Sequence, residues 1–157
     1  KAEFYGQYFD VVICNDSGLY FEELDFEDLR QPGLNIRTPM NMDRLSDEEM
    51  IDYYSKLIAG LGGKVTAYYL DGIAVYNHGV ISSFMDNMAA QKNGLFYMID
   101  KASSKRFEGW PLDSLSINKE NGKYFVDGSI EESKENIIKD QYQKSVVDFL
   151  IKSLHIA

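Results

Sequence analysis

Apolar and polar residues alternate at the start of the chain in a way that predicts β-strands. Residues 4–14, with the sequence FYGQYFDVVIC, place aromatic and β-branched side chains at every second position, which is typical of a half-buried strand. Residues 15–18, Asn-Asp-Ser-Gly, have the composition of a turn. Residues 19–26 then mix apolar and acidic side chains. The pattern therefore predicts a first hairpin whose second strand is short and acidic.

The apolar pattern changes to a helical period after residue 45. Ser46 and Glu49 have the spacing of a capping box, in which the serine hydroxyl accepts from the amide three residues later and the glutamate carboxylate accepts from the serine amide. Apolar side chains then recur every three or four residues and predict one buried face: Met50, Tyr54, Leu57 and Leu61. Glycines at 60, 62 and 63 predict the helix end, because glycine adopts the left-handed C-cap conformation without strain.

The middle of the chain predicts three more elements. Residues 64–76 favour a hairpin about Asp71-Gly72, because this pair supplies the positive φ angles of a tight two-residue turn. A helix is expected over residues 80–91 and a strand over residues 95–100. Residues 101–114 are expected to form a loop.

The C-terminal part predicts one hairpin and one long helix. The segment SLSINKENGKYFV favours strands on either side of Asn121-Gly122. The last helix is expected to begin near Ser129 or Ser133 and to end near Leu154, with acidic residues at its start, as the helix dipole favours. The element order is then β-β-α-β-β-α-β-β-β-α. Residues 1–157 are therefore expected to form a single α+β domain, with a mainly antiparallel sheet built from hairpins and about three helices.

Length and composition fit one folded domain. The chain has 157 residues, of which 45% are hydrophobic and 13% aromatic, and this content argues against disorder. Cys14 is the only cysteine, which excludes an intrachain disulfide and slightly favours a reducing, cytoplasmic compartment. No apolar run reaches the ~18 residues that span a membrane. The chain begins with Lys1 rather than methionine, so the compartment is left open.

The net charge of −9 is confined to the first third of the chain. Residues 1–54 carry thirteen acidic and four basic side chains, whereas residues 55–157 carry twelve of each. The acidic density is highest between Asp16 and Asp28, where aromatic residues are interleaved with carboxylates. A one-sided field of this kind bears on partners and solubility rather than on fold. Charged side chains on a strand also protect a sheet edge from unwanted pairing, which is the structural alternative.

The leading functional hypothesis is a non-enzymatic module that binds and neutralises a basic protein, such as a toxin or a nuclease. The size, acidity and aromatic content are of the kind found among bacterial immunity proteins, antitoxins and phage-encoded inhibitors. Carboxylates can stand where the phosphates of a nucleic acid would lie, and aromatic side chains can anchor the interface. The residues expected to bind the partner are Asp16, Tyr20, Glu22, Glu23, Asp25, Phe26, Glu27 and Asp28.

A small enzyme or ligand-binding domain is the second hypothesis. His78 is expected in a turn after a strand, and turns that carry Asp71 and Trp110 can converge at the same end of the sheet. If the chain is an enzyme, Ser82 as nucleophile, His78 as base and Asp71 as orienting carboxylate are the catalytic candidates. A secreted or structural accessory domain, kept soluble by its acidity, is the third hypothesis.

The sequence signals no cofactor and no metal site. Gly60-Leu61-Gly62-Gly63 ends a helix rather than opening one, so its free backbone groups are carbonyls, which do not bind phosphate. Histidine and cysteine pairs with metal-binding spacing are absent, and the carboxylates from Glu22 to Asp28 are irregularly spaced for calcium. The negative charge disfavours nucleic-acid binding. The oligomeric state is left open.

Overall fold

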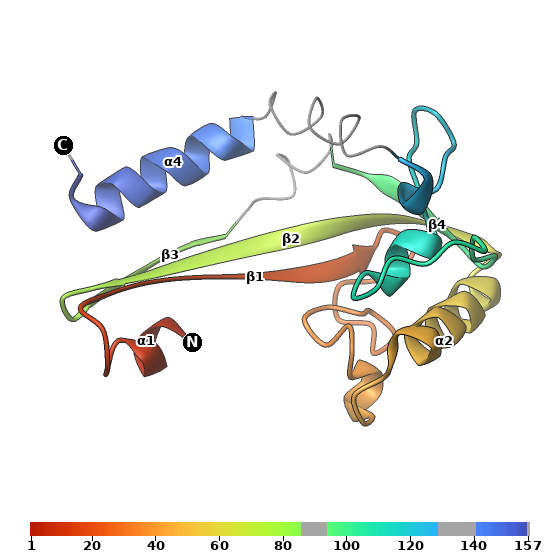
Figure 1. The fold of residues 1–157 in the computed structure, drawn as a ribbon, viewed down its shortest axis with the longest axis horizontal. Coiled ribbons are helices and arrows are strands. Elements are labelled where there is room, and N and C mark those ends of the chain that lie inside the picture. Colours follow the sequence, from red (N-terminus) through yellow and green to blue (C-terminus); the bar gives the residue numbers. More distant parts are fainter. Residues whose placement is uncertain (86–93, 129–140, 157) are drawn as a thin grey trace.

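One long strand, β2 (Lys64–Asn77), organises the sheet (Figure 1). All eleven residues of β1 (Val11–Phe21) pair antiparallel with one edge of β2. Two strands share the other edge of β2: β3 (Val80–Met85) pairs with its second half and β4 (Phe96–Ile99) pairs with its first residues. The short strand β5 (Ser116–Ile117) adds to the free side of β4. β1 is therefore an edge strand.

The computed structural model describes residues 1–85, 94–128 and 141–156. In these ranges the five strands are accompanied by three α-helices: α1 (Ala2–Tyr5), α2 (Asp47–Gly60) and α4 (Gln141–Leu154). The predicted fold class, a single α+β domain with a mainly antiparallel sheet and about three helices, is confirmed. Within the same ranges, no helix has the length and apolar character needed to cross a membrane.

The first two predicted hairpins are instead continuous strands. The segment 15–18 lies inside β1 and Asp71-Gly72 lies inside β2, and these segments pair with each other, with Asp16 opposite Gly72 and Ser17 opposite Asp71. The Ser17 hydroxyl donates to the Asp71 carboxylate across the two strands. Two segments of turn composition thus satisfy one another's backbone and side-chain groups in an extended ladder.

The turn between β2 and β3 falls at His78-Gly79, where the φ angles are 45° and 90°. The predicted helix over residues 80–91 is therefore wrong in its first part, because Val80–Met85 forms β3. Residues 86–91 lie outside the described ranges. The strand predicted over residues 4–14 is extended only from Val11 onward, where β1 begins, and its first residues belong to α1 (Ala2–Tyr5).

Elements that depend on local signals are present where the sequence placed them. α2 begins with the predicted capping box: the Ser46 amide donates to the Glu49 carboxylate at 2.8 Å, and Ser46 Oγ accepts from the Glu49 amide. The chain leaves α2 through Gly62 and Gly63, whose φ angles are 102° and 85°. The strand predicted over residues 95–100 is β4.

The last two predicted elements are present in part. The hairpin about Asn121-Gly122 is reduced to β5 and a single bridge from Ile117 to Tyr124. The last helix, α4, ends at Leu154 as predicted, and its expected start near Ser129 or Ser133 lies outside the described ranges.

The main core fills the space between α2 and one face of the sheet. Side chains alternate along a strand, so the odd-numbered residues of β1 and β2 face this core at the α2 end of the sheet. The largest fully buried side chains there come from α2, β1, β2, β4 and the segment before β5: Tyr54, Ile58, Leu19, Phe21, Val65, Met98 and Leu115. The buried Tyr54 hydroxyl donates to the Ile36 carbonyl at 2.9 Å, which ties the segment before α2 to the helix.

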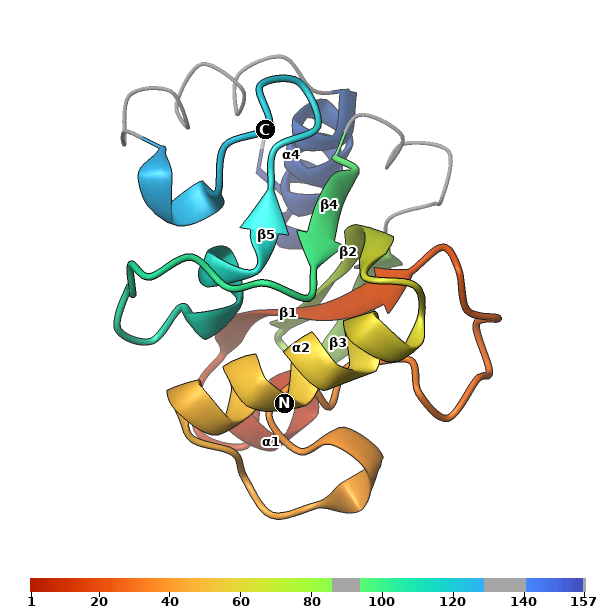
Figure 2. The ribbon, with the colours of Figure 1, turned by 90° about the vertical axis from the view of Figure 1, so that its right-hand side faces the viewer.

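At the other end of β2, α1 and α4 lie on opposite sides of the sheet (Figure 1). α1 is followed by Gly6, whose lack of a side chain is required, because a Cβ there would lie 2.7 Å from the Tyr76 ring. α4 packs on β2 and β3. The ring centroids of Phe84 and Phe149 are 5.6 Å apart, and the side-chain amide of Asn77 donates to the Ser153 carbonyl at 3.0 Å. Figure 2 shows the opposite end, with α2 in front and β4 and β5 above it.

Candidate functional site

A groove of about 410 Å³ lies on the face of β1 and β2 that does not carry the α2 core. Even-numbered residues of β1 and their partners on β2 form its floor, with Cys14 opposite Ala74 and Asp16 opposite Gly72. Both partners on β2 have small or no side chains, so the floor is low beside the Asp16 carboxylate. Ser83 of β3 is in register with Ala74 and continues the floor.

An ion pair between Lys1 and Asp16 lies in this groove. The Lys1 Nζ atom is 3.0 Å from Asp16 Oδ2, and Asp16 Oδ1 accepts from the Ser17 amide at 3.1 Å. The hydrogen bond from Lys1 holds the pKa of Asp16 below its ordinary value, so the carboxylate is ionised at neutral pH. Both side chains are 62% exposed, and water screens their attraction. The pair therefore costs little to open, which leaves both groups available to a ligand.

Aromatic side chains form another part of the same groove. Tyr20 is four residues beyond Asp16 on the same face of β1, which places its Cα roughly 13 Å away at ~3.3 Å per residue. Phe26 stacks on Tyr20 with ring centroids 4.9 Å apart and planes 7° apart, and the cross-strand partner Tyr68 stacks at 5.7 Å. Gly18 makes room for the Tyr20 ring, since a Cβ at Gly18 would lie 2.8 Å from it. The groove thus combines a charged pair with a flat apolar surface.

The structure divides the eight residues that the sequence predicted to bind a partner. Asp16, Tyr20 and Phe26 line the groove. The other five lie in the segment at and after the end of β1: Glu22, Glu23, Asp25, Glu27 and Asp28. None of these five lines the groove.

Two of those five carboxylates have local structural partners. Both oxygens of Glu23 accept from the Thr66 amide, at 2.7 and 2.9 Å, and so cap the ladder where β1 ends. Asp28 is paired with Arg30 at 2.6 Å, and the hydrogen bonds from Arg30 lower the pKa of Asp28 to about 2. Part of the acidic segment therefore holds its own backbone in place.

The three residues of the Ser-His-Asp candidate are not brought together. Asp71 and His78 are seven positions apart on one extended segment, which is roughly 23 Å at ~3.3 Å per residue. Asp71 accepts from Ser17, and His78 lies in the turn after β2, where its amide donates to the Asp10 carbonyl at 2.8 Å. Ser82 is opposite Val75 on β3. An orienting carboxylate must lie within hydrogen-bond reach of its base, so these three residues do not form a relay.

Asp71 and Trp110 do meet, but away from His78. They line a cavity of about 440 Å³ on the face of β1 and β2 opposite the groove, together with Ser17, Tyr69 and Asp113. Carboxylates predominate among its polar groups, and its one basic side chain, Arg37, is paired with Asp47 at 2.9 Å. An acidic cavity does not suit an anionic substrate.

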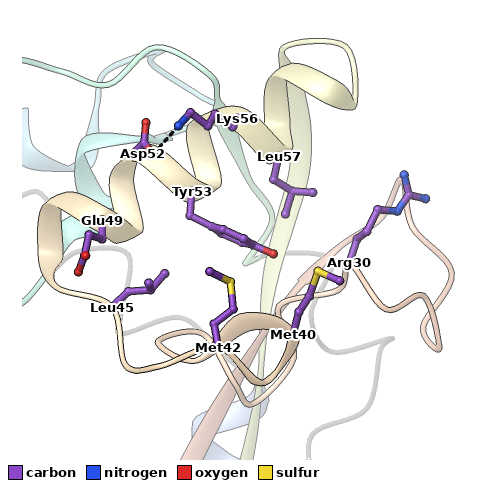
Figure 3. A pocket seen from close by; sticks show the side chains of 9 residues that line it. All are labelled: Arg30, Met40, Met42, Leu45, Glu49, Asp52, Tyr53, Lys56 and Leu57. Carbon is purple, nitrogen blue, oxygen red and sulfur yellow. Dashed lines mark hydrogen bonds and ion pairs between the residues drawn. The ribbon is translucent and has the colours of Figure 1, made fainter.

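A third hollow, of about 550 Å³, lies between α2 and the segment before it (Figure 3). Its lining is mainly apolar, from Met40, Met42, Leu45, Tyr53 and Leu57. The two cations beside it already have partners: Lys56 pairs with Asp52 at 2.7 Å, and Arg30 pairs with Asp28. Because the charged groups of its lining are already bound to neighbouring residues, this hollow does not offer a convergent set for chemistry.

Comparisons with known proteins give a similarity of fold. No protein-family model matches the chain, and no curated protein matches its sequence. The Ham1 protein of Staphylococcus aureus is similar over 95% of this chain and 69% of its own, with a TM-score of 0.61 and 19% identity. A nucleoside-triphosphatase, or dITP/XTP pyrophosphatase, from Mycobacterium abscessus is similar over 92% and 70%, with a TM-score of 0.63 and 11% identity. A HAM1 protein from Coxiella burnetii is similar over 87% and 66%, with a TM-score of 0.57 and 14% identity.

These similarities correct the functional interpretation of the sequence. The fold is one shared with Ham1 proteins and with a nucleotide pyrophosphatase, and none of these three proteins is an inhibitor, an immunity protein or an antitoxin. The hypothesis of an acidic inhibitor is therefore wrong, and so is the preference for a non-enzymatic protein over an enzyme. The second hypothesis, a small enzyme or ligand-binding domain, is better supported. The chain spans 66–70% of the length of these structures.

Lys1 is the residue of the candidate site that sequence reasoning missed. It lies fifteen positions from Asp16, and the two meet only because α1 folds back beneath β1 and β2. No spacing rule relates a lysine before a short helix to a carboxylate in the middle of a strand. The candidate site is thus formed by tertiary structure rather than by a local motif.

Proposed function

We propose that this chain hydrolyses nucleoside triphosphates to a nucleoside monophosphate and pyrophosphate, in the groove that contains Lys1 and Asp16. One observation carries the proposal: a cation and a carboxylate 3.0 Å apart, beside a flat aromatic surface, on a sheet whose fold is similar to that of a dITP/XTP pyrophosphatase. Both charged groups are exposed in the groove, so a substrate can reach them.

Lys1 is the group that binds phosphate. An ammonium ion attracts phosphate oxygens strongly and can direct its three donors toward them. A triphosphate that enters the groove replaces Asp16 as the partner of Lys1, and the exposed ion pair offers little resistance to this exchange. Substrate binding therefore releases the Asp16 carboxylate for a second role.

Asp16 is the group that activates water. The hydrogen bond from Lys1 is the main cause that lowers the pKa of Asp16, so loss of that bond to the substrate makes the carboxylate more basic. The water oxygen forms a bond to the α-phosphorus, the bond from this phosphorus to the α–β bridging oxygen breaks, and the water proton passes to Asp16. The products are the monophosphate and pyrophosphate. Mg²⁺ that arrives with the triphosphate can share the carboxylate, since Mg²⁺ in proteins is commonly held by one or two carboxylates plus substrate phosphates.

We assign binding of the nucleobase to the aromatic side chains of the groove. Phe26 keeps 56% of its surface exposed while it stacks on Tyr20, so it can offer ring area to a planar base. Stacking of a base on an aromatic side chain contributes about 1–3 kcal/mol and tolerates different bases. Tyr20 and Asp16 lie on the same face of β1, so base and phosphates occupy one continuous groove.

The test is a product analysis with a matched pair of variants. The protein is incubated with Mg²⁺ and dITP, XTP or ATP, and the nucleotides are separated by ion-exchange chromatography. We expect monophosphate and pyrophosphate in equal amounts. Asp16→Asn is expected to lower kcat/KM about 100-fold or more, the usual effect of losing a general base. Asp25→Asn removes an exposed carboxylate outside the groove and should leave turnover unchanged.

Two outcomes would contradict the proposal. One is the absence of monophosphate with every nucleotide in a sample that melts cooperatively. The other is wild-type turnover by Asp16→Asn. Lys1→Met provides an independent check, because it should raise KM more than it lowers kcat if Lys1 binds phosphate in both the ground state and the transition state.

A further inference from the structure

The outer edge of β1, which faces away from β2, is closed at the α2 end of the sheet. The Leu19 amide donates to the Gly33 carbonyl at 3.0 Å, and the Leu19 carbonyl accepts from the Gly33 amide at 2.8 Å. The Gln31 side chain bonds in the same way to the Phe21 amide and carbonyl, at 2.9 and 2.8 Å. The segment that follows β1 therefore satisfies the outward backbone groups of this end.

The other half of the same edge is open. Backbone groups alternate between the two edges of a strand, so the amides and carbonyls of Val11, Ile13 and Asn15 point outward, as those of the odd-numbered residues further along β1 do. The even-numbered residues point toward β2, and the Asp10 carbonyl accepts from the His78 amide on that side. In the part of the chain that the structure describes, no hydrogen bond reaches the three outward amides or their carbonyls.

This open half lacks the usual protection of an edge strand. Lysines, prolines and bulges commonly prevent unwanted pairing at a sheet edge. Residues 11–15, with the sequence VVICN, contain neither a lysine nor a proline, and their register with β2 runs without a bulge. The side chains of Val11 and Ile13 are 45% and 52% exposed, and that of Phe9 is 62% exposed. Free backbone groups beside exposed β-branched side chains form a template on which an extended segment can add a strand.

We propose that this open edge binds an extended segment of another protein, which joins the sheet as an added strand. The segment pairs its backbone with Val11, Ile13 and Asn15 and packs β-branched side chains on the first two. A lysine or arginine of the segment pairs with Asp10, whose exposed carboxylate has no ion pair among the described residues. This edge lies at the opposite end of β1 from the acidic residues 22–28, and its use does not depend on nucleotide hydrolysis.

The charges disfavour a second copy of this chain as the occupant. When all three open residues pair with the same three residues of a second copy, a two-fold axis passes through Ile13 and Val11 lies opposite Asn15 of the other copy. The same register places Asp10 opposite Asp16 of the other copy, and like charges directly opposite destabilise an antiparallel pair. Each copy also carries a net charge of −9. A different protein with a basic residue beside an apolar strand avoids both costs.

The test is a titration of the full chain with a labelled peptide, followed by fluorescence anisotropy. The peptide has seven residues, with lysine at each end and alternating valine and threonine between them, and the control has N-methyl groups on its five central amides. We expect saturable binding of the first peptide and at least tenfold weaker binding of the second, because several backbone hydrogen bonds are lost. Asp10→Asn should weaken binding at low salt, since the peptide lysine loses its partner.

A pair of variants at Ile13 separates the backbone from the side chain. Ile13→Pro removes an amide that points outward and makes no bond to β2, a position at which edge strands accept proline. It should weaken peptide binding tenfold or more. Ile13→Thr keeps both the amide and the β-branched shape, so it should bind nearly as well as the wild type.

Hydrogen exchange in the wild-type protein gives a measurement that does not depend on how these variants fold. The amides of Val11, Ile13 and Asn15 should exchange rapidly in the protein alone and slowly with the peptide. Those of Val12 and Cys14, which bond to β2, should be protected in both states. Three results would overturn the proposal: no saturable binding, equal affinity for the N-methylated peptide, or slow exchange at the three outward amides before peptide is added, as a second copy would cause. The assays contain no nucleotide, so their outcome is separate from that of the turnover assay.

Discussion

Two glycines in the sheet have different reasons to be glycine. A Cβ at Gly18 would lie 2.8 Å from the Tyr20 ring and 3.2 Å from the backbone of Gly33, so a side chain there forces its neighbours to move. A Cβ at Gly72 would meet only the Asp16 carbonyl oxygen, at 3.9 Å, so there is room for it. Gly18 is thus required by packing, whereas Gly72 keeps the floor of the groove low.

This difference gives a prediction with an internal control. Gly18→Ala should lower the free energy of unfolding by about 1–3 kcal/mol, the usual cost of overpacking. Gly72→Ala should change it by less than about 0.5 kcal/mol but should raise KM for a nucleoside triphosphate, because its methyl group fills the floor beside Asp16. Urea denaturation and steady-state kinetics measure the two effects. Equal destabilisation by both substitutions would show that the close contacts at Gly18 are not the reason why glycine is needed there.

The residues of the candidate site differ in how far the sequence could reveal them. Asp16, Tyr20 and Phe26 stood out because acidic and aromatic residues cluster around them, although the role first assigned to them was wrong. His78 stood out because histidine is a common catalytic base, but its side chain lies in a turn remote from Asp71. Lys1 carried no signal at all. Residue type and local density were therefore informative about chemistry and uninformative about which groups meet.

Among the elements, α2 was predictable because its start is encoded within four residues. The hydrogen bonds between Ser46 and Glu49 form in any context that lets the segment become helical. The hairpins were not predictable in the same way. Asp71-Gly72 is a strong turn pair, yet it is extended in β2, because pairing with β1 on one side and β3 on the other satisfies its backbone.

The cap of α2 predicts a pH dependence of stability. Hydrogen bonds from Ser46 lower the pKa of Glu49 below its ordinary value of 4.5. A carboxyl group whose pKa is lower in the folded than in the unfolded state stabilises the fold above the unfolded pKa, and this stability is lost as the pH falls through the folded value. The Tm of the wild-type protein should therefore decrease below about pH 4.5, in part through Glu49.

Ser46→Ala tests this contribution. The variant should lose about 1 kcal/mol of stability at pH 7, the usual cost of removing a serine N-cap. Its Tm should also fall less steeply with acid than that of the wild type. The hydroxyl of Ser46 is the larger of the two causes that lower the pKa of Glu49, and only the hydrogen bond from the backbone amide remains in the variant. Thermal melts followed by circular dichroism between pH 7 and acid conditions give both values. Parallel curves for the two proteins would mean that Glu49 does not contribute through this cap.

In the whole molecule, the acidic side chains of the first third of the chain lie in several separate places rather than on one surface. Asp16 lies in the groove, Glu23 caps a strand ladder and Asp28 binds Arg30. At the start of α2, Glu48 pairs with Arg106 at 2.8 Å, so some of this charge is matched by bases from the second half of the chain. The charge is therefore distributed over several local tasks.

The net charge of −9 acts at long range on the nucleoside triphosphate that we propose as substrate. Repulsion should slow the approach of a triphosphate at low salt, and screening should reduce it as the Debye length falls from about 30 Å near 0.01 M salt to about 8 Å near 0.15 M. At saturating Mg²⁺, we expect KM to decrease over this range while kcat stays constant. Kinetics at several sodium chloride concentrations measure this. An increase in KM would show that local attraction by Lys1 outweighs the field of the whole molecule.

The sequence by itself determined the α+β class, the start and end of α2, and the strand that became β4, because periodicity, caps and glycine stops act over a few residues. Tertiary structure decided whether residues 15–18 and 71–72 form turns or extended strands. Their extended form depends on pairing with each other, and paired residues such as Ser17 and Asp71 are 54 positions apart in the sequence. It also decided that Lys1 lies beside Asp16. Local preferences are worth about 1 kcal/mol per residue or less, whereas a ladder of eleven paired residues adds many such contributions, and the pairing prevails.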